Sequence, residues 1–511
     1  MEKARSIIIA ILFITITFAS CSFQIGEPPQ EPITGLDDGS VKVIREDEGP
    51  EQGGILNLFM TTPRTLNPLT TSDLYIKQLS AFVFDSLFYE DPSGKINKAL
   101  VKDYTFSQDG VILDIELKDN ILFHDGTAFT SDDVAFSIET IKNAGEKSIY
   151  YPQARNIQSI NILTRTKLRL VLNRADEAGI ACLTFPILPE HIFKDWPVEG
   201  YTDSMKLIGT GPFIFESYDD NSINLARNDS WWLLNEEDGL KHPIWLDGIS
   251  FKIYPNESDM MQAFQRQQID IAWLEEGEIE SYSKRADIFF NKYVSNILEL
   301  LVLSPKGETN SALANDGFRN ILIKYLGYYS SKNPFEKGMT TYDSGVSSDF
   351  MNKEEAISAL EEIGYHYDMD REYLYTYRNN YKYPIKLSLT YNSLNIDREE
   401  ISEWIYEALD SIGINVQIKA STYEELQKLS KNGRYDMMLL GCRIPLCSNQ
   451  EETLDIINRD LNMNDEKDTI YPLYRKYGAV LYHNYIRGER KPLWNNIYNG
   501  WTGWYLVHTQ E

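Results

Sequence analysis

Apolar and polar residues alternate most clearly between residues 383 and 442. From Ile385 to Tyr391 every second residue is apolar, which is typical of a strand. Residues 396–412 instead place apolar side chains three and four positions apart, which predicts a helix that stops at Gly413. The same reasoning predicts a strand at 414–418, a helix capped by Ser421 or Thr422 that runs through Leu429, and a strand at 435–440.

This β-α-β-α-β order favours parallel strands joined by right-handed crossovers. Ligands gather beyond the carboxyl ends of such strands. The third strand is predicted to end just before Gly441, Cys442 and Arg443. Gly441 would let a ligand approach the backbone, and Arg443 would suit a carboxylate or phosphate. A surface arginine after a tight turn explains Arg443 equally well.

Other segments carry similar patterns. The block at 121–141 predicts a strand, a turn at Asp125-Gly126, and a helix whose capping box pairs Thr130 with Asp133. Further strands are predicted at 55–59, 104–108, 111–117, 209–218, 222–227 and 269–272, and further helices at 73–88 and 260–267.

The first residues look like an export signal. A basic start is followed by an apolar run from Ser6 to Phe18, too short to span a bilayer, and by small residues before Cys21. This pattern resembles a bacterial lipobox, in which Cys21 would be lipidated; an ordinary signal peptide with a chance cysteine is the alternative. Residues 22–52, rich in Pro, Gly and acids, predict a disordered tether, and no later segment predicts a membrane span.

Composition restricts the remaining body. It is roughly 460 residues long, more than a single hydrophobic core usually holds, so at least two lobes are expected. The formal net charge of −27 argues against nucleic acid, whose phosphates require clustered Lys and Arg. The chain has 32 Tyr, a residue that suits binding surfaces, although sheet and core packing would account for most of them.

No catalytic or metal-binding motif stands out. The six His are scattered, none has the spacing of a zinc site, and there is no P-loop, dinucleotide loop or nucleophile elbow. We therefore expect no enzymatic activity, no cofactor and no metal. Cys182 lies in an apolar run and is expected to be buried. Cys442 and Cys447 are close enough in sequence for a disulfide in an exported protein, but they are also compatible with a pair of thiols.

Four stretches in the same order resemble the family 5 extracellular solute-binding proteins, the peptide- and nickel-type receptors of ABC importers. They are Gly53-Gly54 with Thr65 to Pro68, Phe106 to Gly110 followed by Ile121 to Ile141, Gly209 to Phe213 with Arg227-Asn228 and Trp231-Trp232 downstream, and Leu409 to Ile418 followed by Gly433 to Asp436. The second stretch is long and specific. In the family, the block at 121–141 is scaffold, so the resemblance implies that His124 is structural.

The resemblance implies an α/β, two-lobed periplasmic-binding-protein-like fold with mixed sheets, hinge strands and an extra small domain. The expected boundaries are a lipoprotein signal at 1–21, a tether at 22–52, lobe I at 53–88, 173–285 and 482–511, the small domain at 89–172, and lobe II at 286–481. Such a receptor would bind a small peptide or other polar solute by lobe closure and deliver it to ABC permease subunits.

The expected protein is a monomer held by its lipid anchor on the extracytoplasmic face of the bacterial membrane, or in the periplasm. The alternative is a sensory or adhesion lipoprotein that keeps the fold without a transport role. Peptide-binding relatives usually carry a Trp, and soon after it an Asp for the peptide amine, where this chain has Cys442 to Leu446, so Arg443 would prefer an anion. The expected ligand-binding residues are Leu74, Tyr75, Gly441, Cys442, Arg443 and Tyr485.

Overall fold

The computed structural model describes residues 49–91, 95–175, 179–196, 206–235, 243–274, 282, 284–306, 311–332, 340–341, 350–444 and 470–507. All of them fall within one compact unit, residues 42–511. Cys21, the signal and nearly all of the tether lie outside the described residues. Among the described residues, no helix has the length and apolar content that a membrane crossing requires.

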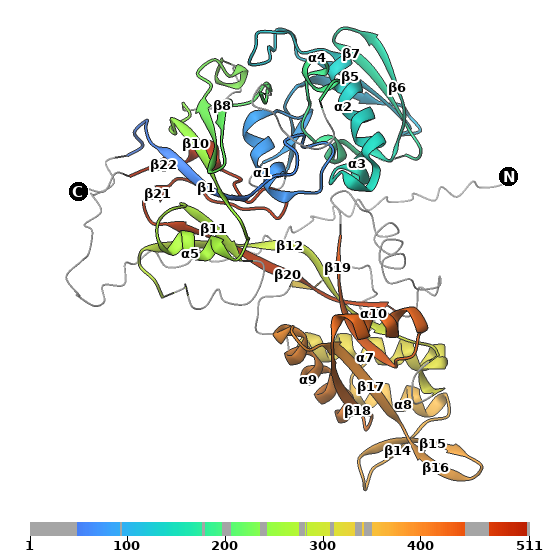
Figure 1. Cartoon of the computed structure of the whole chain (residues 1–511). Coiled ribbons are helices and arrows are strands. Elements are labelled where there is room, and N and C mark those ends of the chain that lie inside the picture. The colour runs from blue at the N-terminus through green and yellow to red at the C-terminus, as the bar shows by residue number, and fades with distance from the viewer. Residues whose placement is uncertain are drawn as a thin grey trace, which may run out of the picture. The chain divides into compact units, whose positions relative to one another are not determined.

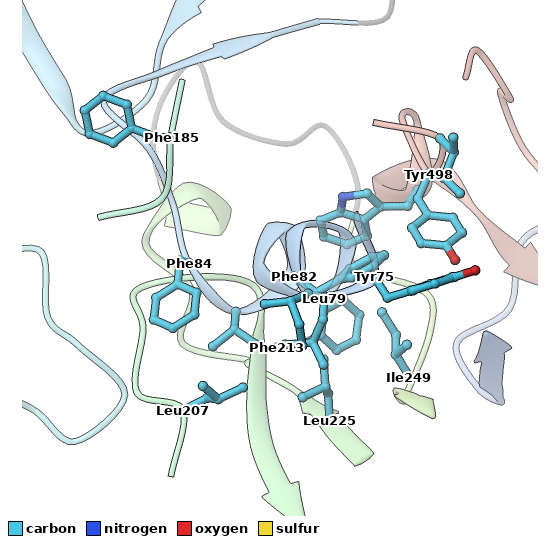
Figure 2. Packing of buried hydrophobic residues seen from close by; sticks show 14 of the residues in the cluster. Tyr75, Leu79, Phe82, Phe84, Phe185, Leu207, Phe213, Leu225, Ile249 and Tyr498 are labelled. Carbon is cyan, nitrogen blue, oxygen red and sulfur yellow. The ribbon is translucent and has the colours of Figure 1, made fainter. Parts of the chain in front are cut away.

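The first sheet combines the start of the chain with its middle. Its strand order is β1-β10-β9-β8, with β1 parallel to β10 and the other pairs antiparallel. Helix α1 packs on this sheet through Leu79 and Phe82, close to Phe213, Leu225 and Ile249 (Figure 2). The elements are β1 (Ile55–Thr61), α1 (Leu74–Val83), β8 (Phe213–Tyr218), β9 (Ser222–Arg227) and β10 (Gly248–Tyr254).

Two sequence predictions for this region are wrong at their ends. The helix predicted at 73–88 stops at Val83, because Phe84 turns to an extended conformation (φ −121°, ψ 140°). The strand predicted at 209–218 begins only at Phe213. Both ends meet at one contact, in which the Gly211 N–H donates to the Val83 carbonyl at 2.9 Å and leaves no room for a side chain at Gly209 or Gly211.

A second sheet, of antiparallel strands, has the order β4-β5-β7-β6 and packs against α2. The capping box predicted for α2 is confirmed: Asp133 Oδ2 accepts from the Thr130 N–H at 2.8 Å, and Asp133 Oδ1 accepts from the Glu190 N–H at 3.0 Å. The elements are β4 (Val101–Phe106), β5 (Ile112–Leu117), α2 (Ser131–Ala144), α3 (Tyr151–Ala154), β6 (Ile157–Thr164), β7 (Lys167–Leu172) and α4 (Glu190–Phe193).

The third sheet contains the predicted β-α-β-α-β unit. Its main strand order is β11-β20-β12-β19-β17-β18, and the parallel pairing of β17 with both β18 and β19 confirms the prediction. Thr422, rather than Ser421, caps α10. The elements are α5 (Asp259–Gln265), β11 (Ile271–Leu274), β12 (Ile288–Leu303), β17 (Lys386–Asn392), α9 (Ile396–Ser411), β18 (Asn415–Ser421), α10 (Tyr423–Asn432), β19 (Met437–Arg443) and β20 (Ile470–His483) (Figure 1).

Strands β12 and β20 are long enough to belong to more than one hydrophobic core. The amino-terminal part of β12 and the carboxyl-terminal part of β20 contribute Ile288, Tyr293 and Tyr482 to the core around α1. The opposite parts contribute Leu301 and Tyr474 to the core that contains α9. Both strands therefore run from one core to another without a break in the chain.

The remaining elements cover these sheets or form small ones. Helices α7 and α8 pack in the core that contains α9, and β14, β15 and β16 form a separate three-stranded sheet. The bounds are β2 (Phe88–Glu90), β3 (Ile96–Lys98), α7 (Asp316–Lys332), β13 (Thr340–Thr341), α8 (Lys353–Glu362), β14 (His366–Asp368), β15 (Tyr373–Arg378), β16 (Tyr381–Pro384), β21 (Ile486–Arg487) and β22 (Tyr505–Leu506).

Candidate functional site

Leu74 and Tyr75 open helix α1, where the Asp73 side chain caps the helix by accepting from the Tyr75 N–H at 2.8 Å. The Tyr75 hydroxyl donates to Glu257 Oε1 at 2.9 Å. Burial, with the nearby Glu257 carboxylate, raises the pKa of Tyr75 well above its usual value. The phenol is therefore a neutral donor at every physiological pH. Leu74 is 39% exposed and can make an apolar contact.

Aromatic rings gather beside Tyr75, at the carboxyl ends of three strands. Phe59 comes from β1, Tyr254 from β10 and Trp273 from β11. The Phe59 and Tyr254 rings are stacked with their centroids 5.2 Å apart, and the centroids of the Tyr75 and Trp273 rings are 5.6 Å apart. The sequence prediction included Tyr75 but missed Tyr254 and Trp273, although their positions at strand ends were a usable signal.

Gly441, Cys442 and Arg443 lie within strand β19 and not beyond it, so the predicted end of this strand at residue 440 is wrong. The strand is longer because residues Ile297 to Glu299 of β12 pair with it as far as Arg443. Cys442 is buried and Arg443 is exposed. Cys447, the proposed disulfide partner of Cys442, lies outside the described residues.

Charged side chains of the protein itself lie close to Gly441. A Cβ atom at this position would lie 2.6 Å from an Arg398 guanidinium nitrogen and 2.9 Å from Glu299 Oε1. Arg398 donates to Glu299 from two of its guanidinium nitrogens, from Nε to Oε2 at 2.9 Å and from Nη2 to Oε1 at 3.2 Å. Lys476 lies 3.5 Å from Glu299 and 3.4 Å from Asp397. Sequence reasoning missed this network because its members are far apart in the chain.

Tyr485 has a partner within the protein. Its hydroxyl donates to Asp270 Oδ1 at 2.6 Å, and the other Asp270 oxygen accepts from the Asn57 side chain at 3.1 Å. Burial raises the pKa of Asp270, which these donors oppose. Tyr485 thus ties the segment after β20 to β1 and to the start of β11. It does not line either of the two cavities described next.

A cavity of about 380 Å³ lies beside α1, and sequence reasoning did not foresee it. Its lining includes Lys77, Asp85, Gln153, Trp231, Asn495 and Trp501. A second cavity, of about 430 Å³, is lined by polar residues that include Arg378, Lys386 and Gln417.

Asp85 is the most strongly held carboxylate in the lining of the first cavity. One of its oxygens accepts from Trp232 at 2.6 Å, Thr210 at 2.9 Å and Trp231 at 3.3 Å. Burial raises the pKa of Asp85 to about 6 despite these donors. The carboxylate connects the Gly209–Pro212 loop to the two tryptophans, which gives it a structural role in shaping the cavity.

Among the described residues, no group of three or more His, Cys, Asp or Glu side chains is arranged to hold a metal ion. The His124 ring bonds to the backbone on both sides: its Nε2–H donates to the Gly211 carbonyl at 2.9 Å, and its Nδ1 accepts from the Gly209 N–H at 3.3 Å. This placement agrees with the structural role that the resemblance implied. Cys182 is buried, as predicted.

Comparison with known proteins defines the class. The bacterial extracellular solute-binding proteins of family 5 match residues 95–444, more than half of the chain, and the protein belongs to this family. The predicted resemblance and fold class are thereby confirmed. Family 5 proteins are extracytoplasmic receptors of ABC importers and not enzymes.

The individual relatives are distant in sequence, but their alignments cover most of this chain. The nickel-binding periplasmic protein of Escherichia coli K12 is 20% identical over 395 residues, covering 73% of this chain and 72% of that protein. The oligopeptide-binding protein AppA of Bacillus subtilis is 24% identical over 430 residues, covering 77% and 74%. The crystal structure of the ABC transporter substrate-binding protein CtaP of Listeria monocytogenes has a TM-score of 0.64 at 19% identity, covering 90% of this chain and all of that one.

Proposed function

We propose that this protein is a monomeric, lipid-anchored receptor that binds a short peptide or similar polar solute and delivers it to an ABC permease. The family match over residues 95–444 is the observation that carries the proposal. The relative AppA, which is an oligopeptide-binding protein, supports a peptide cargo.

We further propose that lobe I consists of residues 53–88, 173–285 and 482–511, the small domain of 89–172, and lobe II of 286–481. Membership of the hydrophobic cores supports the division between lobe I and lobe II, since Phe82, Phe251 and Trp504 share one core, whereas Leu322 and Leu409 share another. Residues of the proposed small domain belong to the first of these cores. Strands β12 and β20 run from one core to the other and are the proposed hinge.

The proposed anchor is the acylated Cys21. The test is to separate membranes from soluble extract of cells that make the full chain, and to follow incorporation of labelled palmitate. We expect Cys21→Ala to lose the label and move to the soluble fraction. Cys182→Ala is the matched control and should stay on the membrane. A membrane-bound, unlabelled wild-type protein would contradict the lipid anchor.

The proposed ligand-binding residues are Leu74 and Tyr75 beside the aromatic rings, and Gly441, Cys442 and Arg443 on β19, with Tyr485 as a weaker candidate. Mass spectrometry of cargo that co-purifies with the full chain tests the function directly. We expect an anionic solute, most simply a peptide, and its loss in Arg443→Ala. Arg434→Ala, an exposed arginine just before the same strand, is the control. Equal retention by both variants would remove Arg443 from the site.

A further inference from the structure

The second cavity, of about 430 Å³, lies between the β15–β16 hairpin and the amino-terminal ends of β17 and β18. It is separate from the cargo residues proposed on β19. In the register of β17 with β19, Leu389 lies beside Met437, so Gly441 is level with Ser393. Lys386, in the cavity, is seven residues before Ser393, a distance of roughly 20 Å along the strand.

One wall of the cavity is a face of the hairpin. Thr376 pairs with Tyr383, and Arg378 pairs with Tyr381, so these four side chains stand on the same face. The guanidinium carbon of Arg378 lies 5.7 Å from the centroid of the Tyr383 ring. The Tyr383 side chain is 45% exposed and that of Tyr381 is 71% exposed. This wall therefore offers a cation and two accessible aromatic rings side by side.

The other wall is the polar face of β17 and β18. Lys386 pairs with Asn415, and Ser388 pairs with Gln417, so these side chains also share one face. Leu387, between them in β17, belongs to the hydrophobic core on the other face. Lys386, Asn415 and Gln417 are exposed. The ammonium group and both amides can therefore meet an occupant of the cavity.

The charge of the lining differs in sign from that of the whole chain. Two cations, Arg378 and Lys386, stand among the described lining residues, and none of these residues is Asp or Glu. The chain as a whole carries a formal net charge of −27. Distant charges are largely screened beyond about 8 Å at physiological ionic strength, so the local cations set the charge that an occupant meets. An anion is therefore the matching occupant.

The aromatic rings and amides define the occupant further. A sugar ring has a face of C–H groups that can pack on Tyr383, and hydroxyl groups at its rim that suit the exposed amides. Because Arg378 is so close to the Tyr383 ring, the acidic group should be attached to the sugar ring itself, as in a uronic acid. Tyr381 is two residues further along β16, roughly 7 Å on, where a second sugar unit would meet it.

We propose that this cavity binds an acidic oligosaccharide of the uronic acid class, with Arg378 and Lys386 pairing its carboxylates and a sugar ring packed on Tyr383. The volume falls within the range of roughly 300–1,000 Å³ that is usual for small-molecule sites. The site does not depend on the proposed transport function, and it would let the protein hold an acidic glycan while the cargo residues are occupied.

The test compares charged and neutral forms of one probe. Full-length protein, solubilised in detergent, is titrated by calorimetry with trigalacturonate, with its neutral trimethyl ester and with the galacturonate monomer. We expect trigalacturonate to bind about fivefold more tightly than the ester, since exposed cations contribute a few-fold each. It should also bind more tightly than the monomer, which reaches only one tyrosine. Raising the salt concentration to about 0.5 M should largely remove the preference for the acid.

Two variants separate the charge from the ring. Lys386→Met should reduce the preference for acid over ester and leave the affinity for the ester unchanged. Tyr383→Leu should weaken the binding of acid and ester alike. Lys428→Met and Tyr423→Leu are the matched controls, because they change exposed residues of α10 that do not line the cavity, and they should behave as wild type. Urea unfolding checks that each variant is folded.

Several outcomes would overturn this site. Equal binding of trigalacturonate and its ester, or binding of neither, removes the acidic sugar as ligand, and so does an acid preference unchanged in Lys386→Met. If triglutamate or a short oligothymidylate binds as tightly as trigalacturonate, the saccharide class is wrong. Loss of binding in Arg443→Ala, with retention in Lys386→Met, would place the probe at the cargo residues. That result would refute the second site and leave the proposed function standing.

Discussion

Gly441→Ala probes the network of Glu299, Arg398 and Lys476, which lies beside β19. The new methyl carbon would lie 2.6 Å from Arg398 and 2.9 Å from Glu299, closer than an ordinary carbon contact. Neither side chain can move aside freely, since the side chain of Glu299 is 1% exposed and that of Arg398 12% exposed, and each holds the other. Strain, or the loss of the longer 3.2 Å hydrogen bond between them, must follow.

The expected cost can be bounded. Overpacking typically costs about 1–3 kcal/mol, and a hydrogen bond to a charged group contributes about 1.5–3 kcal/mol. These two costs should not be added together. A side-chain movement that relieves the clash also breaks the hydrogen bond, so the protein loses stability through one or the other. Replacing Gly by Ala also lowers the conformational entropy of the unfolded chain, which stabilises the folded state by about 0.4–1 kcal/mol. We expect a net loss of about 1–3 kcal/mol in the free energy of unfolding.

A double-mutant cycle is the assay. Urea unfolding, followed by tryptophan fluorescence, is measured for wild type, Gly441→Ala, Arg398→Ala and the double variant. If the clash with Arg398 is the cause, the Gly441→Ala cost should fall below about 0.5 kcal/mol in the Arg398→Ala background. The same cost in both backgrounds, or no cost in wild type, would refute the reasoning.

Two further predictions concern named contacts. Burial raises the pKa of Asp85 from 3.8 to about 6, so the free energy of unfolding should fall as the pH rises through that window, by at most roughly 3 kcal/mol. In urea titrations at several pH values, Asp85→Asn should remove this pH dependence. Asp133→Ala should lower the free energy of unfolding by about 1–2 kcal/mol through loss of the α2 cap and of the Glu190 hydrogen bond, and a neutral result would contradict the cap.

The features that the sequence predicted well are local ones. The capping box of Thr130 and Asp133 involves residues three apart, and the strand from Ile385 to Tyr391 is defined by alternation alone. Their physical causes act over a few residues, so they can be read from the chain without its fold. The parallel order of β17, β18 and β19 followed from helices placed between strands, and it was confirmed.

The candidate site was predicted less completely. The sequence indicated Gly441 as a point of close approach, but only the structure showed that Glu299 and Arg398 make that approach. These two residues are 99 positions apart in the chain. The fold likewise brings Lys77 to Trp494, from the opposite end of the chain.

The sequence by itself therefore determined the turns, the helix caps, the alternation of the strands and, through ordered motifs, the family. The tertiary structure alone decided where α1 and β19 end and which charges of the described residues neutralise one another. The physical reason is that strand ends and buried charges depend on partners brought close by folding, such as β12 for β19 and Val83 for Gly211. A local pattern of residues cannot predict those partners.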